Sequence, residues 1–154
     1  MLTGWIISSC NKGDEASAID SFLLDRDGKW QLASLRVETL HGDTSVRRDT
    51  LNTSCKFTQT FTFKADGTCQ YDYYSCLDQK TTGSWQLISG DSVVLRAPMV
   101  VKDTTAKGTA TPFRNAQVLN LGQNSLILQV VVTDTLYRVP LVLRRRITRY
   151  GFIH

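Results

Sequence analysis

The chain has 154 residues and a mass of 17.3 kDa, the size of one domain that can bury a core without disulfides or metals. With 42% hydrophobic and 21% charged residues, it is neither a disordered chain, nor collagen-like, nor a membrane protein with several spans. A net charge of +4 is too small to indicate nucleic-acid binding by itself, and two histidines are poor material for a His-based active site or a zinc centre.

The first nine residues, MLTGWIISS, carry no charged side chain and are apolar around Ile6 and Ile7. Together with Cys10 they resemble the lipobox of bacterial lipoproteins, in which the cysteine is acylated and becomes the mature N-terminus. Because the basic start is missing and the apolar core is short, we interpret residues 1–9 as a truncated signal peptide. Residues 10–27 then hold the lipidation site, Cys10, and a flexible polar tether. The alternative is a disordered N-terminus with an isolated cysteine.

Lipidation of Cys10 would decide where the protein resides. Attached acyl chains give stable membrane anchoring once two or more are present. The expected location is therefore the bacterial cell envelope, as an outer-membrane lipoprotein that faces the periplasm or the cell surface. The membrane, reached through this anchor, is the first expected partner.

From Gly28 onward, helical periodicity is absent and β-forming residues alternate with turn residues. Eight strands are predicted: Lys29–Val37, Cys55–Lys64, Thr68–Cys76, Gly83–Ile88, Ser92–Arg96, Arg114–Leu121, Ser125–Val132 and Tyr137–Arg146. Two connections, 38–54 and 97–113, are predicted to be long loops. Short connections without intervening helices favour an all-β fold, an eight-stranded antiparallel up-and-down barrel over 28–147, with 148–154 as a C-terminal tail.

The predicted hairpin registers are those that place apolar side chains on one face of the sheet. They set Leu121 opposite Leu126 with Leu119 opposite Leu128, Leu87 opposite Val93 with Trp85 opposite Leu95, and Val132 opposite Tyr137. The segment KADGT (64–68) predicts a type I turn followed by a left-handed glycine, Gly67. This turn would set Phe63 opposite Cys69 and Phe61 opposite Tyr71.

Two segments of the chain, GKWQL (28–32) and GSWQL (83–87), are near copies of each other. The first resembles the G-x-W motif on the opening strand of lipocalins. With FTFKADGT, TGSWQLISGDSVVL and the paired hydrophobic strands that follow, residues 28–145 resemble the lipocalin-like domain family of bacterial envelope lipoproteins. The resemblance implies a calycin-type barrel behind a lipidated leader, and it implies no catalytic residues.

Besides Cys10, the chain has three cysteines, an odd number for an oxidising compartment. Cys55 and Cys76 lie at the far ends of one predicted hairpin, so a disulfide between them is favoured. Cys69 is expected to be a small, unreactive core residue. No C-x-x-C motif or Cys/His cluster is present in the sequence, so we expect neither a metal site nor a cofactor.

Groups for catalysis are not clustered in the sequence. His41 is expected in a solvated loop, and no nucleophile elbow or phosphate-binding glycine loop is found. Arg144, Arg145 and Arg146, with Arg149, either contact acidic lipid headgroups or polysaccharide, or are simply solvated. Strand alternation separates Arg145 from its two neighbours, so the run does not form one dense patch.

We therefore expect a non-enzymatic binding module for a small hydrophobic or amphipathic ligand. Five aromatic residues on one face are candidates to line the cavity: Trp30, Phe61, Phe63, Tyr71 and Trp85. The alternative for the barrel is an interior filled by these same side chains. The alternative for the function is a structural or interaction subunit of an envelope assembly that binds an envelope protein through loops 38–54 and 97–113. An enzyme ranks third, and nucleic acid is not an expected partner.

Overall fold

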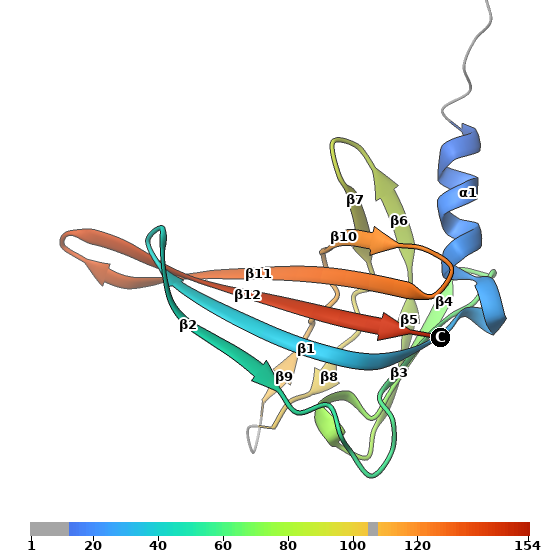
Figure 1. Ribbon diagram of the computed structural model, residues 1–154, viewed down its shortest axis with the longest axis horizontal. Helices are drawn as coiled ribbons and strands as arrows, with labels where there is room; N and C mark the ends of the chain where they lie inside the picture. The colour runs from blue at the N-terminus through green and yellow to red at the C-terminus, as the bar shows by residue number, and fades with distance from the viewer. Residues whose placement is uncertain (1–12, 105–107) are drawn as a thin grey trace, which may run out of the picture.

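The computed structural model describes residues 13–104 and 108–154 (Figure 1). The predicted signal peptide, 1–9, and Cys10 lie outside this part of the chain. The predicted all-β, antiparallel class is confirmed. In chain order the elements are α1 (Gly13–Leu23), η1 (Asp25–Gly28), β1 (Lys29–His41), β2 (Thr44–Leu51), β3 (Thr60–Phe63), β4 (Thr68–Asp72), η2 (Tyr74–Cys76), β5 (Lys80–Ser84), β6 (Gln86–Ser89), β7 (Val93–Arg96), β8 (Val101–Lys102), β9 (Thr109–Ala110), β10 (Ala116–Leu121), β11 (Ser125–Arg138) and β12 (Leu141–Ile153).

The main sheet forms a nearly closed, barrel-like antiparallel structure. Its strand order is β5-β4-β3-β1-β12-β11-β10-β7-β6, and β2 pairs with β1 off this path. The two ends of the path, β5 and β6, are separated in the chain by Trp85 alone, so the backbone itself links them. Apart from β2, the small β8–β9 sheet and the break between β5 and β6, each strand pairs with the next one along the chain, and β1 pairs with β12. This is the up-and-down topology that the sequence predicted.

An aromatic cluster fills the interior of the barrel. Around Phe61 the ring centroids of Phe63, Phe113, Tyr71 and Phe152 lie at 4.1, 4.8, 5.2 and 6.1 Å. These are the separations at which tilted and edge-on aromatic pairs attract one another. Most of the cluster forms because every second residue of each strand points inward, and Phe113 is added to it from the connection between β9 and β10.

The β3–β4 hairpin has the predicted turn and register. Phe63 pairs with Cys69, and Phe61 pairs with Tyr71. Gly67 has a φ of +83°, and its N–H donates to the carbonyl of Lys64 at 3.1 Å. A left-handed residue at this position closes the bulged turn, and glycine adopts it without steric cost.

Two other predicted registers are corrected. Leu121 does pair with Leu126, but a bulge turns Leu119 outward and puts Val118 opposite Leu128. In the β6–β7 hairpin, Leu87 pairs with Leu95, and Ser89 pairs with Val93. The observed register therefore differs from the predicted one by two residues. Because side chains alternate between the two faces of a strand, a shift of two residues leaves every side chain on its predicted face.

The turn predicted between Val132 and Tyr137 is wrong. Strand β11 continues to Arg138, and the chain reverses at 139–140. Val132 therefore pairs with Arg146, and Tyr137 pairs with Val142. Pro140 has no N–H to give to a sheet ladder, which suits a turn better than the strand interior where the prediction had placed it.

The two predicted long loops contain regular structure. Residues 38–54 hold the end of β1, a tight turn at 42–43 and the whole of β2. Residues 97–113 contain the β8–β9 hairpin, and Ala97, Met99, Val101 and Phe113 from this segment are buried. The second segment therefore covers the core, and only the first extends away from it.

Both ends of the predicted barrel domain also differ from expectation. Part of the predicted tether forms α1, whose last residue, Leu23, is buried and accepts a 3.0 Å hydrogen bond from Trp30 Nε1 through its carbonyl. The predicted tail, 148–154, is the end of β12, with Tyr150 and Phe152 in the core. At the end of the chain, the ring of His154 packs 3.8 Å from that of Trp30.

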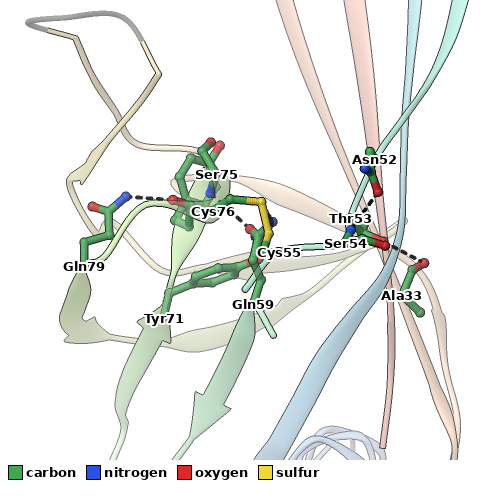
Figure 2. The surroundings of a disulfide bond; sticks show 11 residues. Ala33, Asn52, Thr53, Ser54, Cys55, Gln59, Tyr71, Ser75, Cys76 and Gln79 are labelled. Carbon is green, nitrogen blue, oxygen red and sulfur yellow. Dashed lines mark hydrogen bonds between the residues drawn. A yellow bond between two sulfur atoms is a disulfide. The ribbon is translucent and has the colours of Figure 1, made fainter. Parts of the chain in front are cut away.

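The predicted disulfide joins Cys55 to Cys76, with a Cα–Cα distance of 5.3 Å (Figure 2). Buried Gln59 lies beside it, and the Oε1 atom of Gln59 accepts hydrogen bonds from Tyr71 Oη at 3.3 Å and from the Ser75 N–H at 3.1 Å. The bridge therefore ties the loop after β2 to the core. Cys69 is free and buried, as predicted.

Candidate interaction surface

The predicted cavity residues lie in a packed core. Trp30, Phe61, Phe63 and Tyr71 are at most 1% exposed, and none of them lines any of the four grooves that we describe. Trp85 is half-buried and lines an external groove beside Ser84 and Gln86. The observed packing is that of the filled interior, and a ligand-binding role for these residues stays a prediction.

The part of the sheet that extends beyond the barrel, together with its base, forms a four-stranded arm that we define as residues 36–51 and 131–149; at the base, Arg149 pairs with Gln129. The order of its strands is β2-β1-β12-β11. The last residue of β11 that pairs with β10 is Gln129, so from Val131 onward one edge of β11 has no neighbouring strand in the described part of the chain. In Figure 1 the arm projects to the left, away from α1 and the barrel.

The arm holds the entire net charge of the protein. Of the 18 basic residues in the chain, eight lie in the arm, and all eight are arginines; of the 14 acidic residues, four lie there. Outside the arm, basic and acidic residues are equal in number. A charge this unevenly distributed creates a local positive potential on the arm, and such a potential attracts anionic partners.

Four of the arginines pair with the four carboxylates of the arm. The pairs are Arg47–Asp49 at 2.7 Å, Arg48–Glu38 at 3.1 Å, Arg145–Asp43 at 3.3 Å, and Arg144–Asp134. The other four have no carboxylate partner within 4.0 Å among the described residues: Arg36, Arg138, Arg146 and Arg149. The positive charge that remains on the arm is therefore located at these four side chains.

Two of them meet on one face of the arm. In the β1–β12 ladder, Arg36 lies directly opposite Arg149. The Nε atom of Arg149 donates a 2.8 Å hydrogen bond to Gln129 Oε1, while no hydrogen-bond acceptor is found for the Arg36 side chain among the described residues. Both arginines line a groove of about 370 Å³ together with Arg48, Glu38, Thr50 and Ile147. We call this groove the arginine groove.

Glu38 is the carboxylate of the arginine groove, and it stays ionised. Hydrogen bonds from Ser45 and Arg48, together with the charges of Arg48 and Arg149, lower the pKa of Glu38. It binds Arg48 directly and interacts with Arg149 through its charge alone, so no ion pair within 4.0 Å occupies Arg36 or Arg149 among the described residues.

The other face of the arm carries Arg144 and Arg146. The Nε and Nη2 atoms of Arg144 donate hydrogen bonds to the two carboxylate oxygens of Asp134, and this hydrogen bonding lowers the pKa of Asp134. Arg145 points to the opposite face, so the arginine run is split as predicted. His41, which we expected in a loop, lies in β1 opposite Arg144.

Arg36 and Arg48 were not predicted as site residues, because the first falls in a predicted barrel strand and the second in a predicted loop. One signal was present in the sequence. Every basic residue in 36–51 and 131–149 is arginine, while all seven lysines lie elsewhere. Arginine is the preferred side chain for planar, two-point binding of carboxylate or phosphate groups.

Within residues 13–104 and 108–154 no group of three or more His, Cys, Asp or Glu residues is placed to hold a metal ion. No helix in these ranges has the length and hydropathy that a membrane span requires. Comparison with known proteins found no matching family model, no matching curated protein and no matching solved structure. Membership of the lipocalin-like family therefore stays a prediction.

Proposed function

We propose that this protein is a non-enzymatic interaction subunit of a bacterial cell envelope. In this proposal, the lipid on Cys10 holds it to the outer membrane, the lipocalin-like barrel serves as a rigid support, and the arm binds an acidic protein partner. The single observation that carries the proposal is the location of all the net charge on the arm. This proposal develops the alternative in which the protein is an interaction subunit of an envelope assembly. Residues 38–54, predicted there as a contact loop, form about half of the arm instead.

The arginine groove supports an anionic partner more directly than net charge alone. Like charges directly opposite each other in an antiparallel ladder destabilise the sheet. Arg36 and Arg149 occupy such a pair, and no carboxylate within 4.0 Å compensates either of them in the described residues. A carboxylate from a partner would bridge the two guanidinium groups and relieve this repulsion.

Site-specific cross-linking in cells tests this proposal. A photoreactive residue replaces Thr50, which is exposed in the arginine groove, or Gln86, which is exposed on the barrel as a control. We expect position 50 to capture a defined acidic protein, and Arg36→Glu to abolish that product. Equal products from both positions, or a product that survives Arg36→Glu, would contradict an interaction through the arm.

The anchor requires its own test. Metabolic labelling with a clickable fatty acid should label the wild-type chain, and Cys10→Ala should remove the label. A chain that takes up no label, or a label that survives Cys10→Ala, would refute lipidation while leaving the role of the arm open.

Binding of a small apolar ligand is a second candidate function, at a different place from the predicted interior cavity. An external groove of about 230 Å³ lies between α1 and β10, lined by Phe22, Val118, Leu119 and other residues. Phe22 and Leu119 are both exposed there. A hydrophobic fluorescent probe should bind the wild-type protein and lose affinity with Leu119→Asp. Binding that is unchanged by this substitution would eliminate the groove as the site.

A further inference from the structure

The end of the β11–β12 hairpin exposes apolar side chains that no described part of the protein covers. The exposed fractions are 61% for Tyr137, 94% for Val139 and 67% for Leu141. Pro140, between the last two, is also exposed. Isolated apolar residues on a surface are ordinary, but four of them within five residues at the end of a projecting hairpin form a patch.

The patch covers both faces of the hairpin and its turn. Tyr137 pairs with Val142, and Arg138 pairs with Leu141, so Tyr137 and Leu141 lie on opposite faces of the ribbon. A strand that docks on another folded protein through one face needs apolar residues on that face only. Apolar side chains that project from both faces and from the turn suit a medium that surrounds the hairpin end, and Arg138 is the one charged residue among them. Pro140 also has no N–H, which leaves one backbone donor fewer to desolvate in the turn.

Arginines lie within this apolar end and directly behind it. Arg138 is next to the turn, and Arg144, Arg145 and Arg146 follow in β12. Arg144 and Arg145 are paired with carboxylates, while Arg138 and Arg146 have no carboxylate within 4.0 Å in the described part of the chain. Long basic side chains at this depth reach anionic headgroups while neighbouring apolar side chains enter the acyl boundary, and tyrosine is typical of that interface.

We infer that the hairpin end Tyr137–Leu141 docks onto an anionic lipid surface, with Val139 and Leu141 inserted and Arg138 and Arg146 on the headgroups. From Gln129, where β11 leaves β10, to Arg138 the strand is nine residues long, about 30 Å at the rise of a β-strand. The hairpin therefore reaches a membrane without bringing the barrel against it (Figure 1). This inference does not depend on the acidic protein partner proposed for the arginine groove.

The test uses the full chain with Cys10→Ala, so that no acyl group contributes. The surface is supplied by vesicles of phosphatidylcholine, either alone or with roughly 30% of the anionic lipid phosphatidylglycerol. Binding by sedimentation is expected with the anionic vesicles only. Val139→Asp combined with Leu141→Asp should weaken it at least about tenfold, and Arg146→Gln should weaken it about fivefold, the factor expected for one basic residue near such a surface.

A fluorescent label reports which part of the protein enters the membrane. Val139→Cys labelled with an environment-sensitive dye should shift to the blue on anionic vesicles. Asn124→Cys, in the exposed β10–β11 turn, is the matched control and should not shift. Burial raises the pKa of Cys69 to about 12, so the dye is directed to the introduced cysteine.

The outcomes separate the inference from its alternatives. The double substitution Gln123→Asp with Asn124→Asp adds the same two negative charges as Val139→Asp with Leu141→Asp, but at the β10–β11 turn. It should leave vesicle binding unchanged. If it weakens binding as much as the changes at the hairpin end, or if position 139 does not shift, lipid docking by this hairpin is wrong. Loss of a cross-linked protein with Val139→Asp, in the absence of vesicle binding, would instead assign the patch to a protein interface.

Discussion

Arg36 of β1 lies directly opposite Arg149 of β12, and neither has a carboxylate within 4.0 Å among the described residues. An antiparallel ladder ordinarily sets opposite charges or a charge and a polar group at such positions, because facing like charges cost stability. The pair is therefore a place where the fold gives up stability, as sites that bind a ligand often do.

Arg36→Gln is expected to raise the free energy of unfolding by about 0.5 kcal/mol while weakening the binding of the acidic partner. Relief of repulsion gives the first effect, and loss of one guanidinium gives the second. Urea denaturation and a binding titration measure the two quantities. The control Arg114→Gln, an exposed arginine outside the arm, should change neither. A stability loss with Arg36→Gln would mean that the pair is not repulsive.

Removing the disulfide is expected to destabilise the protein by about 3 kcal/mol. The bond spans a sequence separation of 21 residues, and cross-links of this span stabilise by limiting the unfolded chain. Cys55→Ala with Cys76→Ala should therefore shift the denaturation midpoint downward. Reductant should produce a similar shift in the wild-type protein and none in the double variant; a reductant effect in the double variant would point to a different bridge.

Two glycines in the left-handed region provide a matched pair. Gly28 has a φ of +64°, and a Cβ there would collide with the backbone carbonyl oxygen of Phe63. Gly67 has a φ of +83°, with nothing within 4 Å of its Cβ position. Gly67→Ala should cost about 1 kcal/mol of unfolding free energy from backbone strain alone. Gly28→Ala should cost several times more or prevent folding, and equal losses would contradict the close approach at Gly28.

Acid is expected to loosen the arm before the barrel. Hydrogen bonds lower the pKa of Glu38, through Ser45 and Arg48, and the pKa of Asp134, through Arg144. A carboxylate with a lowered pKa stabilises the folded state above its unfolded pKa, and this contribution disappears as the pH falls through the folded value. Amide exchange in residues 131–138, corrected for its intrinsic pH dependence, should therefore accelerate below about pH 4. Exchange in β7 should not, and parallel acceleration in both would indicate global unfolding.

Local chemistry explains what could be predicted of the fold. The register of the β3–β4 hairpin follows from its turn, since the turn residues fix which positions face each other before any distant contact forms. The pairing of Cys55 with Cys76 follows from the same hairpin, which brings its two ends together. The faces of β6 and β7 were right although their register was not, because a period of two survives a slip of two residues.

The candidate site could not be predicted in the same way. Asp134 falls in the short connection predicted between Val132 and Tyr137, and aspartate between threonines is typical of a turn. In the folded chain it is a strand residue opposite Arg144, which donates hydrogen bonds to both of its carboxylate oxygens. The pairing of β11 with β12 continues to Arg138 and Leu141, and this long-range pairing forms the outer half of the arm.

The sequence by itself determined the all-β class, the up-and-down order of the barrel strands, the alternation that buries the aromatic rings, and the uneven distribution of arginine. These properties depend on residue type and on near neighbours along the chain. Only the tertiary structure decided that β1 and β12 pair, that residues 148–154 complete the core, and that Arg36 meets Arg149. Such contacts join segments more than 100 residues apart, and their free energy depends on partners that no local window of sequence contains.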